Sequence, residues 1–324
     1  MAQAIVLRAY GGPEVLVAEE VAVGQPGPGE LLVRQTAIGV NFHDIYVRSG
    51  LYKTLALPGI PGIEAAGVVE AVGSGVEGFS PGDRVGCVTA EYGAYASERI
   101  VPADRAFRLP GSVDDRTAAA GLVRGLTVAM LTGPVHRVKS GDRVLVHAAA
   151  GGVGRMLCQR LKSIGAVVTG TAGSVAKAEI AREAGCDDVI LYREEDFVAR
   201  VRQATGGRGV DVVFDSVGRD TFMGSLDCLA VRGHLVNFGQ SSGSVPPFDV
   251  SRLAAGSNSV SRPILFHYLT DPGERAALAA GLFDALADGS LSVRIDKIMK
   301  LAQAGAAHEE LESRRATGAV ILEP

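Results

Sequence analysis

The chain has 324 residues, enough for two domains, and its 47% hydrophobic and 21% charged residues are ordinary for a globular protein. A net charge of −4, from 32 basic and 36 acidic residues, argues against a dedicated nucleic-acid-binding protein, which needs a basic surface. The chain starts with a strand-like segment, and no apolar stretch approaches the roughly 18–20 residues of a membrane span, so we expect neither a signal peptide nor a membrane protein.

The first third of the chain predicts short β-strands separated by glycine and proline. Residues 4–10, 31–40 and 67–73 are rich in strand-forming side chains, and turn clusters such as 24–30 lie between them. No long helical period occurs before about residue 115. This part of the chain therefore predicts a β-rich unit, a closed or nearly closed barrel with loops.

The middle of the chain alternates short apolar strands with amphipathic helices. This alternation is typical of a parallel sheet with helices on both faces. The tail returns to mixed patterning. The predicted strands are 142–148, 166–172, 188–192, 210–218, 234–239 and 318–324, and the predicted helices are 152–165, 174–185, 193–207, 221–232, 272–291 and 306–314.

The strongest chemical signal is the segment HAAAGGVG (147–154), which follows a predicted strand and opens a predicted helix. Its pattern, Ala148-x-x-Gly151-x-x-Gly154, is a variant of the glycine fingerprint of dinucleotide-binding folds. Small residues let the backbone approach a pyrophosphate, and the N–H groups and dipole of a helix start favour its negative charge. A plain tight turn is the alternative, but the strand–helix units around the loop favour dinucleotide binding.

The end of the second strand of this module decides between NADH and NADPH. An NAD enzyme usually has an acidic residue there to bind the ribose 2′-hydroxyl, but no acid occurs between Val167 and Lys177. Gly173 leaves room, Ser174 can donate a hydrogen bond, and Lys177 supplies positive charge for a 2′-phosphate. Lys177 by itself is also compatible with a solvated surface lysine; the missing acid favours NADPH.

The four cysteines, Cys87, Cys158, Cys186 and Cys228, are far apart and form no C-x-x-C pair. We expect buried or half-buried thiols in a reducing cytosol, without metal ligation. The six histidines are scattered, and we interpret each as structural or at the surface.

Several segments along the whole chain, taken together, indicate a protein family far more specifically than any one of them alone. They are VNFHDIYVRSGLY (40–52), PGIEAAGVVEAVG (61–73), GLTVAML (125–131), HAAAGGVG (147–154), DSVGRDT (215–221), RGHLVNFGQSSG (232–243), SRPILFHY (261–268) and LESRRATG (311–318). As a set they resemble the quinone oxidoreductases of the medium-chain dehydrogenase/reductase superfamily. The resemblance implies an α/β protein. A GroES-like β-rich catalytic domain would comprise residues 1–124 and 263–324, and a Rossmann domain with a doubly wound parallel sheet would comprise residues 125–262.

The resemblance also implies roles for individual residues. Asn41, Tyr46 and Tyr52 would line the substrate side, and Asn41 and Thr127 would contact the nicotinamide end of NADPH. His43 occupies a variable slot and either tunes substrate choice or has no role. The other cofactor contacts would be Ala150, Gly151, Gly152 and Val153 at the pyrophosphate, Gly173, Ser174, Lys177 and Tyr192 around the 2′-phosphate, and Ser216, Phe238, Gly239, Ser241 and Arg314 elsewhere, with Arg315 able to exchange roles with Arg314.

Zinc-dependent relatives hold a catalytic metal with a cysteine and a histidine where this sequence has Asn41 and Ile63, which cannot replace a thiolate and an imidazole. We therefore expect no metal. Oxidation of a simple alcohol needs a Lewis acid, whereas hydride addition to a quinone or conjugated enone gives a delocalised anion that hydrogen-bond donors can stabilise.

The sequence thus predicts NADPH-dependent reduction of a small quinone or enone. An enoyl or alkenal reductase of the same superfamily is one alternative, and a non-catalytic NADPH-binding protein with an RNA-binding or structural role is another. We expect a cytoplasmic protein without nucleic-acid or membrane partners. The family implies a homodimer formed by edge-to-edge pairing of Rossmann sheets, with the strand around Ser259–Arg262 as the candidate edge.

Overall fold

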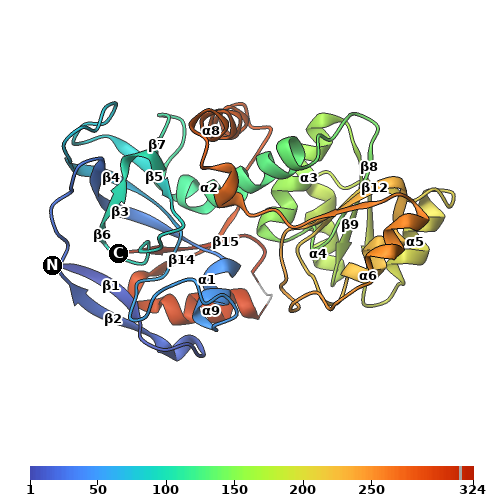
Figure 1. Ribbon diagram of the computed structural model, residues 1–324, viewed down its shortest axis with the longest axis horizontal. Helices are drawn as coiled ribbons and strands as arrows, with labels where there is room; N and C mark the ends of the chain where they lie inside the picture. The colour runs from blue at the N-terminus through green and yellow to red at the C-terminus, as the bar shows by residue number, and fades with distance from the viewer. Residues whose placement is uncertain (314–315) are drawn as a thin grey trace. The chain divides into compact units, whose positions relative to one another are not determined.

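The computed structural model describes residues 1–313 and 316–324 (Figure 1). Its contacts divide the chain into two compact units. The first unit comprises residues 1–123 and 293–324, and the second unit comprises residues 124–292. One unit therefore combines segments from both ends of the sequence, and the other is continuous.

The second boundary lies 30 residues later than the expected one, because residues 263–292 belong to the second unit. Ser292 exchanges hydrogen bonds with the side chain of Gln159, at 2.9 and 3.0 Å. The side chain of Leu282 packs so closely on Gly125 that a Cβ there would collide with it. These contacts tie the segment to the helices of the second unit.

The first unit is built on a mostly antiparallel sheet with the order β14-β15-β3-β4-β5-β7, in which β6 also pairs with β3. β14 and β15 run parallel, and β15 joins β3, so the two parts of the sequence share one sheet (Figure 1). The hairpin β1–β2 completes the strands. Their bounds are β1 Ala2–Leu7, β2 Leu16–Val21, β3 Glu30–Val40, β4 Glu64–Val72, β5 Arg84–Val88, β6 Glu98–Pro102, β7 Ala106–Arg108, β14 Ile295–Lys300 and β15 Ala319–Glu323.

Two helices cover part of this sheet. The short helix α1 (Phe42–Arg48) follows β3 directly, and α9 (Ala304–Glu312) precedes β15. Ile38 and Leu322 of the strands and Leu311 of α9 belong to the same buried core. α9 therefore packs on β1, β3 and β15 in the same core that contains Ile45 of α1.

The second unit contains a parallel sheet with the order β10-β9-β8-β11-β12-β13. Its helices form two contacting pairs, α3 with α4 and α5 with α6, as in a doubly wound fold (Figure 1). The strand order reverses between β8 and β11, which is where such folds bind dinucleotides. The bounds are β8 Arg143–Val146, α3 Gly152–Ile164, β9 Val167–Ala172, α4 Val175–Glu183, β10 Asp188–Leu191, α5 Phe197–Ala204, β11 Val210–Asp215, α6 Phe222–Asp227, β12 Leu229–Asn237, β13 Ser259–Ser261, α7 Leu265–Tyr268 and α8 Pro272–Ala287.

Two predicted helices of this module are too long. The helix expected over 193–207 is shorter at both ends, because α5 runs from Phe197 to Ala204. We expected a helix over 221–232, but α6 ends at Asp227 and β12 begins at Leu229. The run Leu229–Val231 is apolar, and its period does not distinguish a helix from a strand. Pairing of Val210 with Leu229 in the parallel sheet decides in favour of the strand.

The helix α2 (Asp115–Met130) continues as a π-helical turn, Leu131–Val135. Among the described residues, Asp115–Val135 is the helix that is long and apolar enough to cross a membrane, so the expectation that no stretch approaches a span is wrong for this segment. However, 72% of its apolar window is buried within the structure. A buried core helix passes the same test of length and composition.

The four cysteines are free and buried, as expected. Cys158 of α3 and Cys186 before β10 lie in contact, with their Sγ atoms 3.3 Å apart. The hydrogen bond with the Cys186 thiol, followed by burial, raises the pKa of Cys158, so the Cys158 thiol remains protonated at neutral pH and packs as part of the apolar core.

Candidate active site

The loop after β8, residues 147–154, makes a turn that only small residues permit. Ala148 adopts a left-handed conformation with φ of 53°, and the Gly151 N–H donates to the Ala148 carbonyl at 2.8 Å. A Cβ on Gly154 would collide with the Ala148 carbonyl oxygen and lie 3.0 Å from the Ala149 Cα. The expected fingerprint is therefore a tight backbone loop closing on the start of α3.

The start of α3 is open to an anion. Gly151 is the N-cap residue, and no side chain caps the helix. Gly152 and Val153 occupy its first turn and are half-buried, whereas Ala150 is buried behind them. Uncapped N–H groups and the positive end of the helix dipole fit a pyrophosphate.

The end of β9 offers hydrogen-bond donors and no carboxylate. Gly173 follows this strand, and a Cβ there would lie 2.8 Å from the Tyr192 hydroxyl oxygen. The Ser174 hydroxyl oxygen accepts from the Lys177 backbone N–H at 3.4 Å and caps α4. Tyr192 is exposed, and Lys177 is half-buried in the first turn of α4. This set fits a ribose 2′-phosphate.

The remaining expected cofactor residues converge at the ends of β11 and β12. The Ser241 N–H donates to the Ser216 carbonyl at 3.2 Å, and the Phe238 N–H donates to the Asp215 carbonyl at 2.8 Å. A Cβ on Gly239 would lie 2.7 Å from the Ser216 carbonyl oxygen, so these two segments touch. Thr127 is half-buried on α2 in the same unit. Arg314 and Arg315 lie outside the described residues.

Asp215 organises the loop that carries Ser216, a role that was not predicted from the sequence. Its fully buried carboxylate accepts from the N–H groups of Val217 at 2.8 Å and Gly218 at 3.0 Å. It also accepts from the Thr221 hydroxyl at 2.9 Å, at the start of α6. One carboxylate thus fixes the turn from β11 to α6.

In the first unit, Asn41 lies between β3 and α1. It is 8% exposed, and its backbone N–H donates to Asp44 at 2.8 Å. Its side-chain amide donates to the buried Glu64 at 2.7 Å, and Glu64 also accepts from the Val123 N–H at 2.7 Å. The amide of Asn41 is therefore held in one orientation by a buried carboxylate.

Beside Asn41 lies an aromatic cluster formed by Phe42, His43, Tyr46, Tyr52 and Tyr92. The ring centroids of Tyr46 and Tyr52 are 5.1 Å apart, and those of His43 and Tyr52 are 5.6 Å apart, both edge to face. His43 stacks on Tyr92 at 5.8 Å. The structure thus brings Tyr46 and Tyr52 together, as expected, and adds Tyr92, which sequence reasoning missed.

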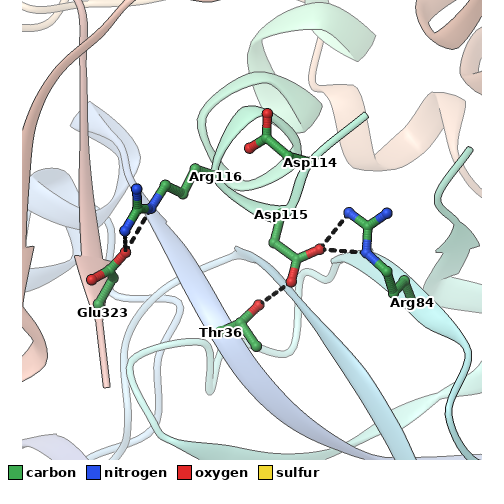
Figure 2. A pocket seen from close by; sticks show the side chains of 6 residues that line it. All are labelled: Thr36, Arg84, Asp114, Asp115, Arg116 and Glu323. Atoms are coloured by element: carbon green, nitrogen blue, oxygen red, sulfur yellow. Dashed lines mark hydrogen bonds and ion pairs between the residues drawn. The ribbon is translucent and has the colours of Figure 1, made fainter. Parts of the chain in front are cut away.

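A surface pocket of about 490 Å³ lies elsewhere in the first unit (Figure 2). Four of its charged groups form two ion pairs, Arg84 with Asp115 at 2.6 Å and Arg116 with Glu323 at 2.7 Å. The carboxylate of Asp114 accepts hydrogen bonds from Thr117 instead. None of the expected site residues lines this pocket, and we do not assign it to catalysis. Its lining residues are Thr36, Arg84, Asp114, Asp115, Arg116 and Glu323.

Known proteins match the chain over its full length. It is 45% identical over 327 residues to quinone oxidoreductase 1 of Escherichia coli K12, with 100% of both chains covered. The chain belongs to the quinone oxidoreductase family. A crystal structure of the E. coli quinone oxidoreductase complexed with NADPH matches with a TM-score of 0.97 at 44% identity, again over 100% of both chains. A 2-haloacrylate reductase from a Burkholderia species is 43% identical over 331 residues, which cover 100% of this chain and 99% of that protein.

Two family models match this quinone oxidoreductase-family chain, one in each unit. The GroES-like domain of alcohol dehydrogenases matches residues 27–111, and the zinc-binding dehydrogenase model matches residues 152–279. The residues at the catalytic zinc positions do not fit that metal. Ile63 is buried and apolar, and the amide nitrogen of Asn41 donates to Glu64, so neither offers a soft or imidazole donor.

A polar chain that is buried except at Glu312 connects α1 with α9. Arg48 forms a bidentate ion pair with Glu312 and lies 3.4 Å from His308 Nδ1. His308 Nε2 lies 2.9 Å from the Tyr95 hydroxyl, which donates to Asp44 at 3.1 Å. Because Asp44 also accepts from the Asn41 N–H, this chain runs from α9 to the residue before α1.

Acidification is expected to weaken this polar chain. Burial, followed by the positive charge of Arg48, lowers the pKa of His308 to about 3, whereas the unfolded chain protonates near 6.5. The unfolded state then binds more protons below about pH 6.5, so stability falls as the pH drops toward 3. Between about pH 7 and about pH 4.5 this one group costs about 2–3 kcal/mol.

Urea unfolding of the wild type, His308→Gln and the exposed control His267→Gln at both pH values measures this contribution. His308→Gln is expected to lose less stability on acidification than the wild type, and His267→Gln to lose as much as the wild type. An unchanged pH dependence in His308→Gln would show that His308 does not carry the effect.

Proposed function

We propose that this protein reduces quinones, or similar conjugated carbonyl compounds, with NADPH and without a metal. The observation that carries the proposal is the acid-free end of β9 beside the uncapped start of α3, in a chain that belongs to the quinone oxidoreductase family. Asn41 and Ile63 in place of zinc ligands favour acceptors whose product anion is delocalised.

NADPH, when bound, supplies the hydride. Gly151, Gly152 and Val153 would hold its pyrophosphate. Gly173, Ser174, Lys177 and Tyr192 would hold its 2′-phosphate, and Thr127 would contact its nicotinamide end. In the first unit Asn41, Tyr46 and Tyr52 orient the acceptor and donate hydrogen bonds to its oxygen, and none of them is a strong general base. Water provides the proton that completes the product.

A second reductase activity has one specific support. A relative at 43% identity is a 2-haloacrylate reductase, and a 2-haloacrylate is a conjugated acid. NADPH oxidation by the purified protein, followed by absorbance with a panel of quinones, 2-alkenals and 2-haloacrylates, separates the candidates. Turnover of quinones supports the proposal, turnover of only the other acceptors favours the related reductase, and no oxidation with any acceptor favours a non-catalytic role.

Replacing Lys177 by alanine is expected to raise the Kd for NADPH about 10-fold and to leave the Kd for NADH nearly unchanged, because only NADPH carries the 2′-phosphate. Fluorescence titration with both cofactors measures the effect. Arg182→Ala on the same helix is the control, since Arg182 pairs with Glu179 at the surface and should not change either Kd. Equal weakening of both cofactors in Lys177→Ala would contradict the 2′-phosphate site.

We also propose a cytoplasmic homodimer. The free thiols suit a reducing compartment. β13 is the edge strand of the second sheet, and pairing with the same strand of a second copy satisfies its open hydrogen-bonding edge. Sedimentation analysis of the wild type and of a Val260→Pro variant on β13 tests this assembly.

A further inference from the structure

Tyr92 of the aromatic cluster has a backbone conformation that a tyrosine rarely adopts. Its φ is 63°, in the left-handed region, where a bulky side chain is strained. Such strain persists only where the surroundings impose it, and it gathers at functional sites. Tyr92 therefore calls for an explanation beyond packing.

The surroundings impose the strain through a buried cation. Arg99 of β6 is 6% exposed, and its Nη1 donates to the Tyr92 carbonyl oxygen at 2.9 Å and to the Thr89 hydroxyl at 3.2 Å. The Thr89 hydroxyl in turn donates to the same carbonyl at 3.3 Å. Burying a guanidinium is costly, and here it serves to fix one peptide group and hence the direction of one side chain.

The phenol of Tyr92 is placed against two polar groups within the otherwise aromatic surroundings. Its oxygen lies 3.2 Å from His43 Nε2 and within hydrogen-bonding distance of the Thr54 hydroxyl. Burial lowers the pKa of His43 to about 4 and raises the pKa of Tyr92. At neutral pH the imidazole is therefore uncharged, and the phenol keeps its proton.

The two lone pairs of the phenol oxygen can accept from His43 Nε2–H and from the Thr54 hydroxyl. Its own O–H is then left for a third partner. We propose that Tyr92, oriented in this way by His43 and Thr54, donates a hydrogen bond to the carbonyl oxygen of the acceptor as hydride addition places negative charge there. The inference rests on the proposed function, because it places the acceptor beside Tyr46 and Tyr52, and it makes Tyr92 a further catalytic residue.

This role explains why His43 and Thr54 lie against the hydroxyl of Tyr92. A donor fixed before the reaction stabilises the developing oxyanion without reorganisation, and the aromatic rings around it lower the local dielectric constant. The benefit grows with the basicity of the anion. An enolate from an enone therefore depends on Tyr92 more than a hydroquinone anion does.

Steady-state kinetics with NADPH test the inference on Tyr92→Phe, which keeps the ring and removes only the hydroxyl. We expect kcat to fall about 10- to 100-fold with a conjugated enone and less with a quinone, while KM changes little. Tyr10→Phe is the matched control, because the Tyr10 hydroxyl makes a long 3.5 Å contact to the Leu55 carbonyl oxygen, and this variant should retain wild-type kcat. Thermal unfolding of both variants checks that the fold is intact.

Thr54→Val provides an independent reading, since Thr54 only orients the phenol. It should lower kcat about 5-fold in the wild type and have no further effect in Tyr92→Phe. Wild-type kcat in Tyr92→Phe with every acceptor, or additive losses in the double variant, would overturn the role of Tyr92 and leave the proposed function intact. If the wild-type protein fails to oxidise NADPH with every acceptor tested, both the proposed function and this inference are overturned.

Discussion

Gly154→Val is expected to raise the Kd for NADPH at least about 100-fold. The cause is steric and local. A side chain at this position collides with the Ala148 carbonyl oxygen and approaches the Ala149 Cα, and these are backbone atoms that cannot rotate away. The loop 147–154 must then open, which removes the N–H groups at the start of α3 from the pyrophosphate. Fluorescence titration with NADPH measures the loss.

The matched control for this substitution is Gly281→Ala. Gly281 lies on the exposed side of α8, and a Cβ there meets no atom within 4 Å. Alanine should leave NADPH binding unchanged and stabilise the helix by up to about 1 kcal/mol. Retention of NADPH binding by Gly154→Val would show that the loop adapts and that the glycine is not required.

Asp215→Ala is expected to destabilise the protein by about 3–4 kcal/mol. The substitution leaves the buried N–H groups of Val217 and Gly218 and the Thr221 hydroxyl without their acceptor. Because the same turn positions Ser216 against Ser241, NADPH binding should weaken as well. The free energy of unfolding from urea titration and the Kd for NADPH are the two measurements.

Asp220→Ala tests whether the effect belongs to the buried carboxylate. Asp220 lies in the same turn, but its side chain is 60% exposed and pairs with Arg219 at the surface. Its removal should change stability by no more than about 0.5 kcal/mol. A similar loss in both variants would assign the effect to the turn in general rather than to Asp215.

The second unit was predictable from the sequence because its elements have clear periods. The strand β8 and the helix α3 flank a glycine loop with a known mechanism, and both begin and end within two residues of the predicted bounds. The errors fall where local pattern and tertiary pairing compete. Leu229–Val231 reads equally well as helix or strand, and the division at residue 292 depends on contacts of α8 with distant helices.

The candidate site was predictable only where the backbone carries the chemistry. Gly173 and the loop 147–154 can be recognised from their residue types and their positions at the ends of predicted strands. Tyr92 could not be recognised in this way, because the partners of its hydroxyl, His43 on α1 and Thr54 in the loop that follows, lie 49 and 38 residues earlier in the chain. Arg99 on β6 is close in sequence, but its bond to the Tyr92 carbonyl oxygen forms only in the folded chain. The sequence left open whether His43 tunes substrate choice or has no role, because its desolvation and its hydrogen bond exist only in the folded chain.

The sheet of the first unit has a consequence for biosynthesis. β3 pairs with β15 along one edge, and the whole second unit, residues 124–292, is translated between these two strands. The ribosome therefore delivers a continuous Rossmann module that can fold while the catalytic unit still lacks β14, β15 and α9. Until those segments emerge, the edge of β3 and the apolar surface beneath α9 stay open. In the nascent chain the sheet of the second unit can therefore be completed before the sheet of the first unit.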